Sequence, residues 1–167
     1  MGAEHPTSQL RPGPLHDSVA HLAFLLGTWR GRGRGGYPTI EPFEYEEEIA
    51  FDHVGDEYLA YAQRSWSPDD GSPIHLERGF LRPGGEGRVE LTVAHVLGVT
   101  EVAEGPVGPT SFSVSSIWVG RTASGSDVTA LERRYRVEGD VLTYQLDMAT
   151  GTTPLGRHLT AELRRGP

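Results

Sequence analysis

The stretch GTWRGRGRGGYPTI, residues 27–40, alternates small residues with arginines and ends in a Tyr-Pro turn. In an extended strand, Trp29 shares one face with Gly31, Gly33 and Gly35, and the arginines occupy the other face. Repeated glycine weakens an isolated strand, so it indicates that another part of the fold, or a ligand, lies close to this backbone. The stretch therefore predicts a strand that something approaches closely on its inner face.

Nine further strand candidates follow, separated by short turns rich in Gly, Pro and Asp. The ten candidates span residues 28–35, 42–53, 57–66, 73–82, 87–96, 98–104, 110–119, 127–136, 140–148 and 156–165. Even spacing favours consecutive antiparallel hairpins, and closing them into a barrel removes the exposed edges. We predict an all-β, ten-stranded antiparallel up-and-down β-barrel. Side chains cannot fill the interior of so wide a barrel, which tends to hold a small ligand.

A short amphipathic helix is expected over residues 15–26, because leucine and valine recur there at helical spacing and Gly27 follows as a stop. The predicted domain organisation is a flexible lead-in over residues 1–14 and one barrel domain over residues 15–165. On the outer faces, Arg30, Arg32 and Arg34 are expected to form cross-strand ion pairs with Glu46 and Glu48.

Composition narrows the function classes. The 167 residues carry a net charge of −8 with a pI near 5.3, which disfavours nucleic acid and anionic membranes as partners. No apolar run approaches the roughly 20 residues that span a bilayer, and we expect a cytoplasmic protein. The absence of cysteine excludes disulfides, zinc–thiolate sites and covalent c-type haem.

Histidines are the main candidates for chemistry. His75, His95 and His158 lie on expected strands, where they can reach the barrel lumen. The sequence contains no HExxH motif, no 2-His-1-carboxylate arrangement with convincing local spacing and no G-x-S-x-G nucleophile elbow. The residues by themselves therefore predict a ligand-binding antiparallel barrel and no particular reaction.

Two segments carry a resemblance to a known family. GTWRGRGRGGYPTI resembles the Gly-x-Trp-x-Gly-x-Gly signature and following Tyr-Pro-Thr of the nitrobindins, small haem-binding barrels related in architecture to the calycins and fatty-acid-binding proteins. MATGTTPLGRHLTAELRR, residues 148–165, resembles the family's second hallmark, a strand that carries the axial histidine. Residues 51–61, 73–82 and 89–105 follow the family's pattern and order, so the resemblance extends from about residue 17 to residue 165.

The resemblance implies a site. His158 corresponds to the axial ligand of the haem iron, and Thr39 to a position near the haem edge. His75, His95 and Met148 correspond to cavity-lining positions on the distal side or around the macrocycle. One non-covalent haem b per chain is implied, because the CxxCH attachment motif is missing.

The activity that the resemblance implies is isomerisation of peroxynitrite to nitrate by the ferric form, with reversible nitric oxide binding by the ferrous form. Its partners would be these small molecules; the oligomeric state is left open, with a homodimer as one option. Two alternatives stand beside it. One is a non-catalytic carrier of a fatty acid or another apolar ligand, and the other is a haem-based sensor or scavenger of nitric oxide.

One detail conflicts with simple alternation. Leu159, Ala161 and Leu163 share one face of the last strand, and His158 falls on the other. If the aliphatic face lined the lumen, His158 would point outward. Either a bulge near Gly156 switches the face, or the aliphatic residues pack outside the barrel against the helix.

Overall fold

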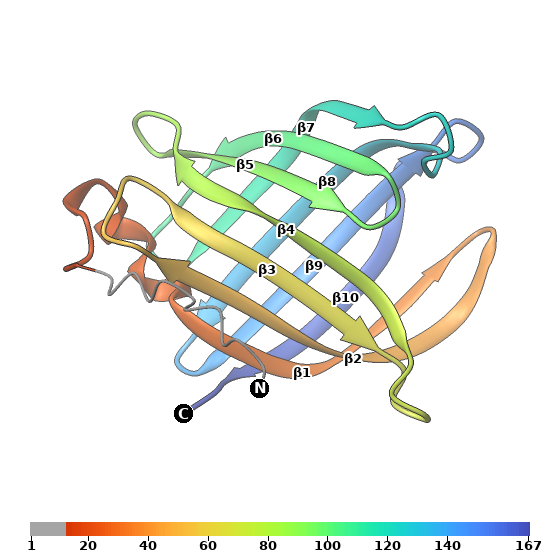
Figure 1. Ribbon diagram of the computed structural model, residues 1–167, viewed down its shortest axis with the longest axis horizontal. Coiled ribbons are helices and arrows are strands. Elements are labelled where there is room, and N and C mark those ends of the chain that lie inside the picture. Colours follow the sequence, from red (N-terminus) through yellow and green to blue (C-terminus); the bar gives the residue numbers. More distant parts are fainter. Residues whose placement is uncertain (1–12) are drawn as a thin grey trace, which may run out of the picture.

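Ten antiparallel strands form a closed barrel in the computed structural model, which describes residues 13–167 (Figure 1). The strands are β1 (Gly27–Tyr37), β2 (Ile40–His53), β3 (Leu59–Trp66), β4 (Pro73–Pro83), β5 (Arg88–His95), β6 (Val99–Pro106), β7 (Ser111–Arg121), β8 (Val128–Glu138), β9 (Val141–Thr150) and β10 (Gly156–Arg165). The predicted up-and-down barrel is confirmed. Most of the predicted lead-in over residues 1–14 lies outside the described residues.

Pairing between the first and last strands closes the barrel. β10 runs antiparallel to β1 from Trp29↔Arg165 to Gly35↔Leu159, and every other strand pairs with its neighbours in the chain. This closure leaves neither β1 nor β10 with an unpaired edge.

A short 3₁₀ helix, η1 (Asp17–Leu25), covers one end of the barrel. The expected helix is therefore present, and as a 3₁₀ helix it has a tighter turn than an α-helix. Its apolar residues Val19, Leu22 and Leu25 are fully buried, and the indole Nε1 of Trp29 donates a 2.8 Å hydrogen bond to the Leu25 carbonyl. Within residues 13–167, no helix is long and apolar enough to cross a membrane.

The glycines of β1 leave space that other parts of the protein fill. A Cβ on Gly33 would lie 2.2 Å from the ring of Tyr45, and one on Gly35 would lie 2.3 Å from the ring of Phe43. A Cβ on Gly31 would meet the backbone carbonyl of Glu162 on β10 at 2.3 Å. The close approach expected from the sequence is therefore made by two aromatic rings and the closing strand, and these rings occupy the space that a ligand would need.

The outer face of β1 carries the predicted ion pairs to Glu46 and Glu48, and Arg34 pairs instead with Glu44. Arg30 pairs with Glu48 at 2.5 Å, Arg32 with Glu46 at 3.1 Å, and Arg34 with Glu44 at 3.5 Å. The arginine side chains are largely exposed, so each pair contributes only about 0.2–1 kcal/mol.

Substituting Gly31 tests how β1 contributes to closure. Gly31→Ala should lower the free energy of unfolding by about 1–3 kcal/mol, because the methyl group overlaps the β10 backbone. Gly36→Ala is the matched control on the same strand, since its Cβ would lie 3.7 Å from Pro42 Cα, an ordinary contact. Urea unfolding of both variants gives the comparison, and equal stabilities would contradict this account of the glycine.

Candidate haem site

A cavity of about 810 Å³ lies at the barrel end away from η1, between the turns that follow the odd-numbered strands. This volume falls within the range of roughly 300–1,000 Å³ that is typical of small-molecule and cofactor sites. Much of the wall is apolar. The aliphatic, methionine and phenylalanine side chains of the lining are Ile40, Phe43, Ile74, Leu97, Val99, Val128, Leu131, Leu146, Met148 and Leu159.

His158 lies on the wall of this cavity because β10 is bulged. The β9–β10 register pairs Arg157 with Asp147 and Leu159 with Leu146, which leaves His158 as the extra residue. Both His158 and Leu159 line the cavity, and Ala161 and Leu163 continue inward as core residues. The bulge is therefore the correct one of the two predicted explanations, and it lies at residues 157–159.

The hydrogen bond of His158 determines its tautomer. Nδ1 lies 3.0 Å from the Gly36 carbonyl oxygen, which can only accept, so Nδ1 carries the proton. Burial lowers the pKa of the imidazole, although the Gly36 carbonyl opposes this. In the neutral ring, Nε2 then holds the lone pair that a metal requires. The ring also meets Tyr37 edge-on, with 5.5 Å between the ring centroids.

His75 on β4 and His95 on β5 line the other side of the same cavity. In the cyclic strand order, β5 lies five positions from β10 and β4 lies four, so these histidines face His158 across the lumen. Met148 on β9 also lines the cavity, as predicted. Thr39 is exposed on the β1–β2 turn and does not line it; the neighbouring Ile40 does.

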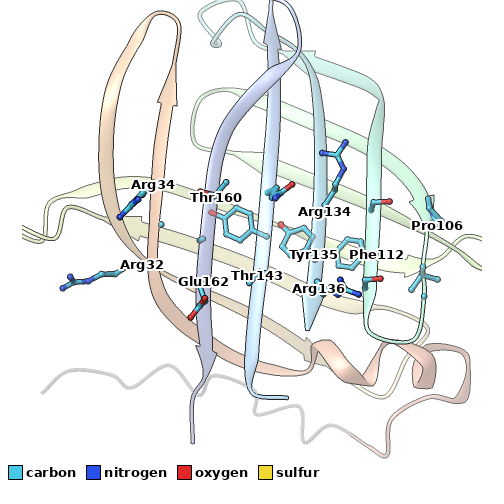
Figure 2. Close-up of a pocket in the computed structure, with 18 of the residues that line it drawn as sticks. Arg32, Arg34, Pro106, Phe112, Arg134, Tyr135, Arg136, Thr143, Thr160 and Glu162 are labelled. Carbon is cyan, nitrogen blue, oxygen red and sulfur yellow. The ribbon is translucent and has the colours of Figure 1, made fainter. Parts of the chain in front are cut away.

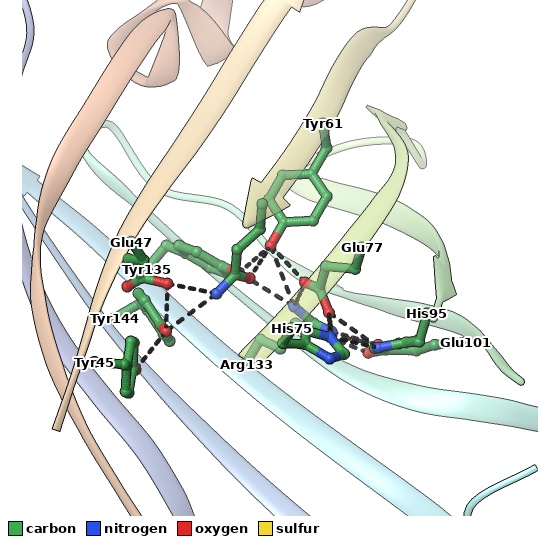
Figure 3. A network of polar contacts seen from close by, with 11 residues as sticks. Tyr45, Glu47, Tyr61, His75, Glu77, His95, Glu101, Arg133, Tyr135 and Tyr144 are labelled. Atoms are coloured by element: carbon green, nitrogen blue, oxygen red, sulfur yellow. Dashed lines mark hydrogen bonds and ion pairs between the residues drawn. The ribbon is translucent and has the colours of Figure 1, made fainter. Parts of the chain in front are cut away.

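A buried ionic cluster forms the floor of the cavity (Figure 3). Arg133 on β8 lies between Glu77 on β4 and Glu101 on β6, with contacts of 2.6 Å and 2.8 Å, and all three side chains are almost completely buried. Burial alone would raise the pKa of both carboxyl groups, but the charge of Arg133 and the hydrogen bonds from Arg133 and the cavity histidines together outweigh it, and the pKa values are lowered. Both glutamates are therefore carboxylates.

The cavity histidines contact these carboxylates. Nε2 of His75 lies 3.2 Å from Oε2 of Glu77, Nδ1 of His95 lies 3.0 Å from the same oxygen, and Nε2 of His95 lies 3.3 Å from Oε2 of Glu101. Burial opposes a charge on His95, but the hydrogen bonds to the two carboxylates outweigh it and raise the pKa of the imidazole.

A third inward-facing acid, Glu47 on β2, behaves differently. Its Oε2 accepts hydrogen bonds from Gln63 Nε2 at 2.5 Å and from Tyr144 OH at 3.0 Å. Oε1 has no hydrogen-bond partner among the described residues. No cation compensates for burial, which raises the pKa of Glu47 to about 8. Glu47 is therefore a neutral acid at pH 7.

This cluster was not predicted from the sequence, although the alternation of inward-facing and outward-facing residues along the strands indicates it. On β8, Arg133 falls on the same face as Leu131, Tyr135 and Val137, all of which are buried. Glu47 likewise falls between the inward-facing residues Tyr45 and Ile49. The prediction that residues 46–48 form only surface ion pairs is therefore wrong for Glu47, which is buried. An ionisable residue in an inward register predicts a buried polar partner.

A second hollow, of about 1210 Å³, lies over β1, β10, β9, β8 and β7 (Figure 2). Arginines are prominent in its lining, but Arg32, Arg34, Arg134 and Arg136 each form an ion pair with a neighbouring carboxylate. Little positive charge therefore remains for an anionic ligand. None of the predicted site residues lies in this hollow.

The cavity residues fit a haem. An imidazole with its lone-pair nitrogen available stands on one wall, an apolar lining surrounds it, and a second pair of histidines lies across the lumen. This donor set would supply one axial nitrogen ligand to the iron and cover the macrocycle with aliphatic side chains. Fold and cavity together define the class of β-barrel proteins that bind haem.

Comparison with known proteins identifies the family. Residues 18–165 match the family described as "THAP4-like, heme-binding beta-barrel domain", and the chain belongs to it. The chain is 47% identical to peroxynitrite isomerase 1 of Mycolicibacterium paratuberculosis, over 92% of this chain and 98% of that protein. It is also 47% identical to the peroxynitrite isomerase of Nocardia farcinica, over 90% of this chain and 92% of that protein. The resemblance inferred from the sequence is thereby confirmed.

Solved structures agree with this assignment. The crystal structure of Rv2717c from M. tuberculosis matches with a TM-score of 0.86 and 42% identity, covering 92% of this chain and 99% of that one. The phycobiliprotein lyase CPES from Guillardia theta matches with a TM-score of 0.64 and 14% identity, which shows a shared fold alone.

Glu47 should make stability depend on pH. Because its pKa is about 8 in the folded state, against 4.5 for an ordinary glutamate, the folded state binds the proton more tightly. Stability should therefore fall as the pH rises from 4.5 to 8, by roughly 1.4 kcal/mol per unit at most. Glu47→Gln removes the titration, so the variant should gain stability relative to the wild type as the pH rises.

Denaturant unfolding at pH 5, 7 and 9 measures this difference. Glu46→Gln is the matched control, because Glu46 lies on the same strand and pairs with Arg32 on the outer face. Its effect should stay constant between pH 5 and 9. A Glu47→Gln difference that is equally constant would show that Glu47 is ionised in the folded protein.

Proposed function

We propose that this protein is a peroxynitrite isomerase that works with a haem held by His158 in the cavity. The observation that carries the proposal is the Nδ1–H···O=C bond from His158 to Gly36, which leaves Nε2 available to a metal inside an apolar cavity. Relatives that align over nearly their whole length and are named peroxynitrite isomerases supply the reaction.

The protein's part in this reaction is to bind, orient and exclude water. Haem, when bound, supplies the iron at which peroxynitrite rearranges to nitrate. His158 holds its ring in one tautomer and one orientation, because Gly36 accepts from Nδ1 and Tyr37 packs against the ring. Across the lumen, Nε2 of His75 contacts Oε2 of Glu77 at 3.2 Å, which fixes the position of this imidazole on the opposite wall.

The charge balance of the cavity floor argues against a fatty-acid carrier. A fatty-acid carboxylate would need a cation inside the barrel, and Arg133 is the buried arginine at the cavity floor. Arg133 already contacts Glu77 and Glu101, so it is not free to pair with a fatty-acid carboxylate.

Several finer points remain predictions. The fit of Thr39 near the haem edge, the b-type haem and nitric oxide binding by the ferrous form follow from the family resemblance. A homodimer is one option that we propose to examine by light scattering, and cytoplasmic localisation is proposed from the cysteine-free composition.

Hemin titration tests the proposed haem ligand. Wild-type protein mixed with hemin should give a sharp Soret band at one equivalent, and His158→Ala should abolish or broaden it, because the axial nitrogen is lost. His21→Ala is the matched control, since His21 is exposed on η1 at the opposite end of the barrel. Identical spectra and affinities for the His158→Ala and wild-type proteins would refute the assignment.

Stopped-flow decay of peroxynitrite tests turnover. The ferric, haem-loaded wild type should accelerate the decay and yield nitrate, and His158→Ala should lose at least about 90% of this acceleration, since enzymes of this kind depend on the placement of the cofactor. Free hemin at the same concentration is the control. Tight haem binding without accelerated decay would favour the sensor or scavenger alternative.

A further inference from the structure

Three donor atoms converge on the cavity wall opposite His158. They are Nε2 of His75, Nδ1 of His95 and Oε2 of Glu77 (Figure 3). The Glu77 oxygen lies 3.2 Å from the His75 nitrogen and 3.0 Å from the His95 nitrogen, and the two nitrogens lie 3.4 Å apart. A transition-metal ion with bonds of about 2.0–2.1 Å holds neighbouring ligand atoms roughly 2.9–3.4 Å apart. The triangle therefore has the size of one face of a metal coordination sphere.

The strand register brings these three donors together. Glu77 on β4 is the direct cross-strand partner of His95 on β5, and His75 precedes Glu77 by two residues on the same strand. All three side chains line the cavity, and their donor atoms lie within 4.8 Å of one another.

Neighbouring groups orient two of the three donors, His95 and Glu77, as they do in established metal sites. Glu101 accepting from His95 Nε2 forms the carboxylate–histidine arrangement that orients metal-binding imidazoles. Arg133 in turn holds both carboxylates, with Nη1 2.6 Å from Oε1 of Glu77 and Nη2 2.8 Å from Oε2 of Glu101.

We infer that His75, His95 and Glu77 form a binding site for one divalent transition-metal ion, distinct from the haem ligand His158. Two imidazoles and one carboxylate suit zinc, cobalt or ferrous iron, and they do not suit magnesium or calcium, which prefer oxygen ligands. His75 is 19% exposed and His95 is 6% exposed, so an ion can enter from the cavity. The inference is independent of the proposed isomerase activity.

Zinc binding to the full-length protein tests the site. Isothermal titration with ZnCl2 in a non-coordinating buffer, on the protein with and without hemin, should show one zinc ion per chain. His75→Ala and His95→Ala should each weaken binding at least about tenfold, because each removes one ligand. His158→Ala should bind zinc as the wild type does, which separates this site from the haem ligand.

His21→Ala is the control for surface histidines, and circular dichroism checks that each variant is folded. Zinc K-edge X-ray absorption on the wild type provides a measurement that needs no variant, and it should show two imidazole ligands. Zinc binding that survives both His75→Ala and His95→Ala, a spectrum without two imidazoles, or no binding by the wild type would each overturn the inference. None of these results bears on hemin binding by His158.

Discussion

The ion cluster of Arg133, Glu77 and Glu101 is the constraint on which the interior depends. A guanidinium fully removed from water costs several kcal/mol unless its partners compensate for the lost hydration. Here two carboxylates from β4 and β6 meet the arginine of β8, so the cluster links strands across the lumen. By filling the barrel at mid-height, it separates the apolar core beside η1 from the cavity at the other end. Replacing Arg133 alone would leave two buried carboxylates without their cation.

The bulge at His158 shapes the wall of the cavity above this ion cluster. One extra residue in β10 lets His158 and Leu159 both line the cavity, whereas strict alternation would place one of them outside. The hydrogen bond from His158 to Gly36 then links the bulge to the end of β1. Because β10 and β5 lie on opposite sides of the closed sheet, His158 faces His75 and His95 across the cavity.

Most of the architecture followed from local pattern. Turn residues and alternation predicted all ten strands, and each observed strand begins and ends within two residues of its predicted bounds. The cross-strand pairs of Arg30, Arg32 and Arg34 followed from the same alternation. The glycines of β1 indicated a close approach without showing what approaches. Only the packed barrel shows that the rings of Phe43 and Tyr45 take that space.

The sequence by itself determined the strand order, the inward and outward faces and the family, and it predicts His158 as the haem ligand. Tertiary structure alone decided which inward residues meet. Alternation with a period of two assigns a side chain to the lumen, but barrel closure and strand register decide what it contacts there. Glu101 and Arg133 are 32 residues apart in the chain, and Glu77 and Arg133 are 56 apart. These groups come together only when the sheet closes, because its curvature brings distant strands to opposite sides of one narrow lumen.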